Sequence, residues 1–279
     1  MCIRDRFITD KKHQQIDKAL YKLLEKEQKD KIDDIWHLRD LGLSNGLEQY
    51  NIPTNLRQAA ALWSHDWPRF EAGFEWLASL VDSTKPATVL DVGAGPGFLI
   101  GFLSTLFPNI SYTGIDLCDN FTKIAEEYLQ SPMITGDYLH VIPPSKLELV
   151  ICNFGFDNTS FTPSDKEHVS AQIGLGDFCV NCSNDLLEQC RPYLAAWKKW
   201  STPNGNLALV GRIVGFGELR AWLLAAAEVG WKLDRQYTST LRVNSIGGEK
   251  EKYPAMLFRP HPEIITESDL DWISHIYVS

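Results

Sequence analysis

The sequence lacks an apolar run long enough to span a bilayer, and its first residues lack the apolar core of a secretion signal. Basic residues are also in deficit, because 27 lysines and arginines stand against 36 aspartates and glutamates for a net charge of −9. A surface of this charge repels phosphate backbones, so nucleic acid is disfavoured unless a basic patch gathers on one face. We therefore expect a cytoplasmic protein without membrane contact.

Cysteine is scarce, and its spacing gives little reason to expect a metal site. Cys179 and Cys182 form a C-x-x-C pair, and Cys190 and His168 could complete four ligands. No second C-x-x-C pair is present, however, and Cys190 falls on the apolar face of an expected helix. Reduced thiols and no bound metal are the prediction.

The rest of the composition is that of a globular protein, with 44% hydrophobic and 23% charged residues. A chain of 279 residues can bury a full core, so one α/β domain with a helical extension is the natural expectation. The opening Met-Cys-Ile-Arg-Asp-Arg is typical of a translated sequencing adapter, and we expect residues 1–6 to contribute nothing to function.

Helical spacing of apolar residues dominates the first part of the chain and predicts an N-terminal helical cap. One or two helices are expected between residues 9 and 40, another over 57–63 with Thr54 as its cap, and a longer one after Pro68. Residues 83–86 form the expected linker to the next unit.

Beyond the linker, short apolar runs alternate with helical patterns. Strands are expected at residues 89–92, 111–117, near 134, and at 147–153, 207–210, 231–235 and 253–258. Helices are expected at residues 99–106, 121–129, 186–197, 219–229 and near 270. The alternation predicts an α/β fold with a doubly wound, mostly parallel, seven-stranded sheet and an antiparallel last strand.

The most informative stretch is residues 88–98, Thr-Val-Leu-Asp-Val-Gly-Ala-Gly-Pro-Gly-Phe, which indicates a buried strand, a glycine turn and an apolar helix. Gly93, Gly95 and Gly97 remove side chains where the backbone must approach a ligand closely. The helix that follows directs its unpaired N–H groups and positive dipole end at the same place. Such a strand, turn and helix predict half of a nucleotide site.

The glycine spacing does not fit the dinucleotide fingerprint. That fingerprint needs a glycine at the sixth position, which is Phe98 when counting from Gly93. The pattern Asp91-x-Gly93-x-Gly95-x-Gly97 instead resembles motif I of the class I S-adenosylmethionine-dependent methyltransferases, whose loop wraps the methionine end of the cofactor. A nucleotide-dependent oxidoreductase is thus disfavoured, and glycines that merely close a turn in another α/β protein are the remaining alternative.

Three later segments match the same family in order and spacing. Asp116 ends an expected strand about twenty residues beyond the glycines, where the family binds the ribose hydroxyls. Asp137 falls where the family keeps an acid or amide near the adenine amino group, and Asn153 ends the strand that leads into the reactive centre. The resemblance covers residues 85–260, approximately.

The resemblance implies one S-adenosylmethionine site at the carboxyl ends of the strands, where open α/β sheets bind their ligands. Asp91 is expected to orient the glycine turn and the methionine ammonium, Asp116 to accept from both ribose hydroxyls, and Asp137 to meet the adenine edge. The candidates to sandwich the adenine ring are Leu117, Tyr138 and Phe154. The whole implied cofactor set is Asp91, Gly93, Ala94, Gly95, Gly97, Phe98, Asp116, Leu117, Gly136, Asp137, Tyr138, Asn153 and Phe154.

The acceptor is expected beside residues 155–184, since a long mixed loop inside a compact domain is usually functional. Asp157 and His168 are the polar groups expected to handle a proton there, although a lone histidine is more often a surface or packing residue. The sequence Asn-Phe-Gly-Phe from Asn153 departs from the Asn-Pro-Pro-Tyr pattern of enzymes that methylate adenine or glutamine amides, so that subclass is disfavoured.

These inferences predict a cap over residues 1–85, a methyltransferase domain over 86–261 with the 155–184 segment as a lid, and a tail over 262–279. Leading helices in the resembling family often cover the cofactor and shape the acceptor pocket. The candidates for this role are Tyr50, Trp63, His65, Trp67 and Arg69. The alternative is that the aromatic residues only pack the helices onto the sheet.

Methyl transfer to an O or N atom of a small-molecule acceptor is the predicted activity, and the sequence indicates no oligomeric state. One alternative is a protein side chain as the acceptor, which would call for an open groove. Another is a methyltransferase-like module that binds the cofactor without turnover.

Overall fold

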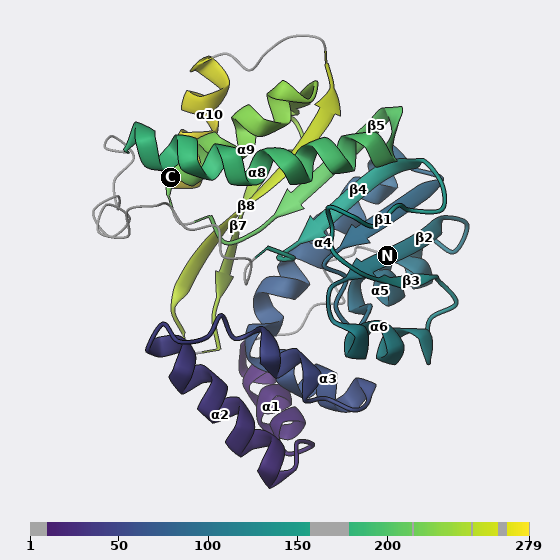
Figure 1. The fold of residues 1–279 in the computed structure, drawn as a ribbon, viewed down its shortest axis with the longest axis vertical. Helices are drawn as coiled ribbons and strands as arrows, with labels where there is room; N and C mark the ends of the chain where they lie inside the picture. Colours follow the sequence, from purple (N-terminus) through teal and green to yellow (C-terminus); the bar gives the residue numbers. More distant parts are fainter. Residues whose placement is uncertain (1–9, 157–178, 214, 247, 262–266, 279) are drawn as a thin grey trace.

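The computed structural model of the chain describes residues 10–156, 179–213, 215–246, 248–261 and 267–278. These residues form a twisted sheet with helices on both faces, and a group of N-terminal helices stands at one end of it (Figure 1). Among the described helices, none is long and apolar enough to cross a membrane.

Eight strands form one mixed sheet in the order β3-β2-β1-β4-β5-β8-β6, with β7 paired to β8 outside this path. Strands β1 to β5 run parallel, and β8 is antiparallel to β5, β6 and β7. The strands are β1 (Thr88–Val92), β2 (Ser111–Asp116), β3 (Met133–Thr135), β4 (Leu147–Asn153), β5 (Ser201–Val210), β6 (Trp231–Leu233), β7 (Ser239–Asn244) and β8 (Lys250–Pro260). The doubly wound, mostly parallel architecture predicted from the sequence is confirmed.

Two details of the sheet differ from the prediction. Strand β7 was not predicted: it pairs with β8 alone, and none of its residues is fully buried. Strand β5 begins at Ser201 and not at the expected residue 207, because the turn-favouring Pro203, Asn204 and Gly205 lie within a register shift opposite Leu147 and Leu149 of β4. The first half of β5 carries no apolar residue, and β7 carries only Leu241 and Val243, too short an alternation to mark a strand.

Period-two alternation divides the core into two layers, one on each face of the sheet. On β4, Val150 faces the layer that contains Trp197 and Trp222, whereas Leu149 faces the layer that contains Phe74. Helices α8, α9 and α10 cover the first face, and α4 and α5 cover the second (Figure 1). The helices of this domain are α4 (Trp67–Thr84), α5 (Phe98–Leu106), α6 (Asp119–Glu126), α8 (Val180–Trp200), α9 (Phe216–Glu228) and α10 (Glu267–Val278).

The cap lies beside the strand ends and is connected to α4. It consists of α1 (Asp10–Tyr21), α2 (Lys26–Asp40), η2 (Leu47–Asn51), α3 (Leu56–Trp63) and η3 (Ser64–Asp66). The N-cap of α3 is Asn55, whose side chain accepts from Gln58 N, so the prediction of Thr54 was wrong by one residue. Helix α1 is held against α4 by His13 and Glu71, whose Nε2 and Oε2 atoms are 2.6 Å apart.

Candidate functional site

The carboxyl ends of β1, β2 and β4 meet at one edge of the sheet, where the chain makes its glycine turn. Gly93, Gly95 and Gly97 have φ angles of 73°, 55° and 78°, a region that residues with a Cβ rarely adopt. The N–H groups of Gly93 and Ala94 both donate to Ile115 O of β2, at 2.9 and 3.0 Å. The turn is therefore fixed against the second strand.

Asp116, the last residue of β2, binds the glycine turn directly. Its Oδ2 accepts from Gly95 N at 2.7 Å, and its Oδ1 accepts from Cys118 N at 2.8 Å. Burial raises the pKa of this carboxyl to about 6, against the opposing effect of the two backbone hydrogen bonds. Each carboxylate oxygen retains a second acceptor site, so Asp116 can also bind hydroxyl groups of a ligand.

Asp91 lies behind the turn, in the middle of the sheet. The residue is 3% exposed, and burial, followed by repulsion from Asp116, raises its pKa well above the usual range. Two buried carboxyl groups with raised pKa values at neighbouring strand ends are typical of functional sites.

The end of β4 continues into a strained backbone next to the glycine turn. Phe154 has a φ angle of 57°, and its N–H donates to Val210 O at 2.7 Å. The next residue, Gly155, packs against the glycine turn, because a Cβ on Gly93 would lie only 2.6 Å from Gly155 Cα. A non-glycine residue held in the left-handed region by its neighbours is found most often where ligands bind.

Charged and polar groups of α4 reach the same end of β4. The guanidinium carbon of Arg69 lies 4.8 Å from the centre of the Phe154 ring, and Arg69 Nη2 is 3.1 Å from Asp66 Oδ2. Asn153 packs against Gly73 so tightly that a Cβ there would lie 2.3 Å from Asn153 Oδ1. That oxygen is buried and has no hydrogen-bond partner among the described residues.

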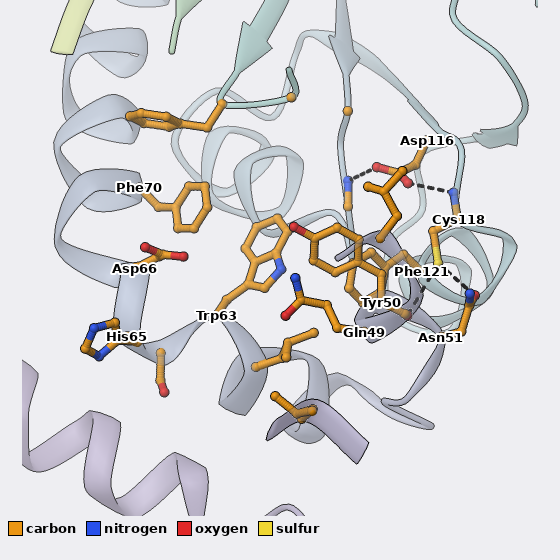
Figure 2. A pocket seen from close by; sticks show the side chains of 18 of the residues that line it. Gln49, Tyr50, Asn51, Trp63, His65, Asp66, Phe70, Asp116, Cys118 and Phe121 are labelled. Carbon is orange, nitrogen blue, oxygen red and sulfur yellow. Dashed lines mark hydrogen bonds between the residues drawn. The ribbon is translucent and has the colours of Figure 1, made fainter. Parts of the chain in front are cut away.

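A cavity of about 1230 Å³ connects the strand ends with the cap (Figure 2). Its wall on the sheet side is made by Gly93, Gly95, Asp116, Leu117, Cys118, Asp119, Phe121, Tyr138, Asn153, Phe154 and Gly155. Its wall on the cap side includes Asp17, Tyr21, Asp33, Trp36, Arg39, Gln49, Tyr50, Asn51, Trp63, His65, Asp66, Arg69 and Phe70. Pockets for single ligands usually measure up to about 1000 Å³, so this one has room for two molecules side by side.

Trp63 stands at the centre of this cavity wall. Its ring stacks on Phe70 with centroids 4.6 Å apart, and it meets the ring of Phe121 at 89°. A Cβ on Gly95 would lie 2.5 Å from Trp63 Cη2, so the absence of a side chain at Gly95 is what lets the cap close on the turn.

Part of the predicted cofactor set lines the cavity and part does not. The residues that line it are Gly93, Gly95, Asp116, Leu117, Tyr138, Asn153 and Phe154. The residues outside its lining are Asp91, Ala94, Gly97, Phe98, Gly136 and Asp137. Asp137 is exposed and turns toward its own loop, where its Oδ1 accepts from Leu139 N at 2.8 Å.

The predicted catalytic pair, Asp157 and His168, lies outside the described residues. Of the cap residues named from the sequence, Tyr50, Trp63, His65 and Arg69 line the cavity, whereas Trp67 packs beside Phe98. Within the described part of the chain, no three side chains of the metal-binding types come together.

Sequence reasoning missed several polar residues of the cavity wall. Gln49 and Asn51 come from η2, a short turn of the cap that carries no motif. Arg212 also lines the cavity and lies just after β5, so the rule that ligands bind beyond strand ends could have identified it.

No protein-family model matches the chain. The tRNA1(Val) (adenine(37)-N6)-methyltransferase of Vibrio parahaemolyticus is 25% identical over 122 residues, which are 40% of this chain and 51% of that protein. The enzyme of the same name from Vibrio cholerae is 29% identical over 104 residues, 34% of this chain and 43% of that protein. The chain therefore spans about half the length of these curated relatives, or less.

Solved structures of methyltransferases superpose on the chain at low similarity. An O-methyltransferase from Brevibacillus brevis in complex with S-adenosyl-L-homocysteine gives a TM-score of 0.47 at 10% identity, covering 75% of this chain and 77% of its own. A sugar N-methyltransferase from Streptoalloteichus gives 0.44 at 13% identity, covering 69% and 88%. The strand order and register of the sheet, rather than these superpositions, define the fold.

The parallel strands with one antiparallel insertion, the glycine turn after β1 and the acid that ends β2 occur here in one arrangement. The chain has the class I, Rossmann-like methyltransferase fold, as its motifs predict.

Proposed function

We propose that the protein binds S-adenosylmethionine at the strand ends and transfers its methyl group to an O or N atom of a small acceptor. The observation that carries this proposal is the contact between Asp116 and Gly95 N within the large cavity. This contact fixes the Asp116 carboxylate beside main chain of the cavity wall. The carboxylate can bind the ribose hydroxyls of a nucleoside, and main chain without side chains lets the nucleoside approach closely.

The described residues fit such a cofactor. Gly93 and Gly95 contribute main chain to the cavity wall beside Gly155 and Trp63, and Asp116 offers acceptor sites for ribose hydroxyls. Leu117, which is 51% exposed, and Tyr138, which is buried, both line the cavity and are the residues proposed to border the adenine ring. Asp91 and Asp137 are proposed to act from outside the cavity lining, through the turn and at the adenine edge respectively.

When bound, the cofactor supplies a methyl carbon activated by a positively charged sulfur. The protein then has to hold the acceptor in line with that carbon and exclude water, and such positioning removes about 7–11 kcal/mol of barrier. Phe70, Phe154 and Trp63 provide apolar walls next to the turn. Asp157 and His168 are the proposed groups to take a proton from a hydroxyl or ammonium acceptor.

A small acceptor is favoured over a macromolecule because the cap covers the strand ends. Trp63 lies against Gly95 and the cap forms one side of the cavity, which supports a bounded pocket over an open groove. Tyr21 of α1 and Trp36 of α2 add partly exposed aromatic rings to the cap side of the cavity.

One finding favours a second candidate, an RNA adenine. The curated relatives are named for methylation of a tRNA adenine at N6, although the Asn-Phe-Gly-Phe sequence from Asn153 differs from the pattern typical of that reaction. The net charge of −9 argues against a polynucleotide partner.

Methyl transfer from labelled S-adenosylmethionine separates these possibilities. We expect label in small hydroxyl or amine acceptors and none in total tRNA or in denatured protein. Label in tRNA alone would favour the second candidate, and label in protein alone a side-chain acceptor. Binding of S-adenosylhomocysteine without any label transfer over a broad panel would leave a non-catalytic binding module.

A further inference from the structure

Gln49 of η2 is buried in the cap with its side chain at the cavity wall. The residue is 4% exposed, and in Figure 2 its carboxamide extends from η2 toward Trp63. Its amide is not among the fully enclosed polar groups that lack a partner, and no hydrogen bond joins it to another described side chain, so it faces the cavity. An amide at a cavity wall can exchange hydrogen bonds with water for hydrogen bonds with a polar ligand that fills the cavity.

The turn that carries Gln49 is fixed next to the segment that follows β2. The sulfur of Cys118 and the amide of Asn120 both lie 3.4 Å from Tyr50 O, and the rings of Tyr50 and Phe121 are 5.2 Å apart. Cys118 N in turn donates to Asp116. These contacts place Gln49 across the cavity from the acid proposed to bind ribose.

We propose that the Gln49 carboxamide hydrogen-bonds the nucleoside part of S-adenosylmethionine and so closes the cofactor site from the cap side. An amide offers two donors and an acceptor, and a nucleoside offers hydroxyls that donate and accept together with an adenine edge. This inference rests on the proposed function, and it assigns to the cap a direct contact that no motif predicts.

The alternative roles of Gln49 give different binding data. If Gln49 contacts the methyl acceptor, its substitution changes the KM of the acceptor and leaves the affinity for S-adenosylhomocysteine unchanged. If Gln49 contacts the methionine end of the cofactor, its substitution lowers the affinity for S-adenosylhomocysteine but not for 5′-methylthioadenosine, which keeps the nucleoside and lacks the amino acid. A nucleoside contact changes both.

Calorimetric titration of the full chain with these two ligands tests the proposal. Gln49→Met keeps the length of the side chain and removes its hydrogen bonds, so we expect both affinities to fall by about tenfold or more. The matched control is Gln28→Met, because the Gln28 amide binds Ile52 O and Gln58 inside the cap and does not line the cavity. Its affinities should stay within about twofold of the wild type.

Three results would overturn the inference while the proposed function stands. The first is unchanged affinity of Gln49→Met for both ligands, and the second is a loss of affinity for S-adenosylhomocysteine alone. The third is an equal loss of affinity in Gln49→Met and Gln28→Met, which would reflect a loosened cap. Thermal unfolding of each variant separates binding losses from misfolding. Failure of the wild-type protein to bind either ligand would instead refute the proposed function, and the inference with it.

Discussion

Asp116 connects sequence, fold and proposed chemistry at the scale of a single residue. Its carboxylate holds the glycine turn through Gly95 N and is also the acid proposed to bind ribose. In Asp116→Asn, we expect S-adenosylhomocysteine binding to weaken by about 1–3 kcal/mol, because a charge-assisted hydrogen bond is lost. Calorimetry measures this directly, with the exposed Asp82→Asn as the control. Equal affinities in the two variants would contradict the ribose assignment.

The pKa of Asp116 makes a separate prediction about stability. Its folded pKa of about 6 lies above the ordinary value of 3.8, so the folded state holds more protons between these pH values. The free energy of unfolding therefore falls as pH rises through this window. Between about pH 4.5 and pH 7 the contribution of Asp116 should decrease by about 2 kcal/mol.

Urea unfolding of wild-type protein and of Asp116→Asn at both pH values measures this effect together with the change that the substitution causes in the pKa of Asp91, because the remaining titrating groups are shared. We expect the stability of the wild type relative to the variant to drop on going to pH 7. A difference that stays constant with pH would show that burial does not raise the pKa of Asp116.

Residues at strand ends were predictable from the sequence, and residues of the cap were not. Asp116 follows an apolar run at a fixed distance from the glycines, and both features are local. Gln49 reaches the cavity only because η2 packs on α6 through Tyr50 and Phe121. Such a contact between distant segments leaves no periodicity or motif in the sequence.

At the scale of elements, the glycine turn and the cap form one tightly packed unit. A Cβ on Gly95 would lie 2.5 Å from Trp63 Cη2, and the φ angle of 55° adds backbone strain. We expect Gly95→Ala to lower the free energy of unfolding by about 1–3 kcal/mol and to abolish measurable S-adenosylhomocysteine binding.

Gly101 of α5 provides the matched control for this substitution. A Cβ there would meet Leu129 Cδ2 at 3.5 Å, an ordinary contact, and the residue is helical. Gly101→Ala should therefore stabilise the protein by up to about 1 kcal/mol and leave binding intact. Chemical denaturation and calorimetry on both variants check the pair, and a Gly95→Ala protein as stable as Gly101→Ala would contradict the packing described here.

The elements themselves were predicted unevenly, for physical reasons. Buried parallel strands such as β1 and β4 are continuous apolar runs, so their places were predicted to within a residue or two. Strand β7 was missed because it lies half exposed and pairs with β8 alone. The start of β5 was missed because a turn signal lies within its register shift.

For the molecule as a whole, charge limits the partners. The net charge of −9 leaves no general attraction for phosphate backbones, and the cap forms one wall of the cavity. We expect no shift of total tRNA in an electrophoretic assay at roughly 150 mM salt. A complex that weakens steeply with added salt would favour the RNA adenine suggested by the names of the curated relatives.

The central claim is that a sulfonium nucleoside lies between the glycine turn and the cap. A crystal structure of the protein with S-adenosylhomocysteine tests it most directly. The account predicts ribose hydroxyls at about 2.7–3.0 Å from the Asp116 carboxylate, with the nucleoside in the cavity between Gly95 and Gln49. A nucleoside bound elsewhere, or no binding at about 1 mM ligand, would contradict it.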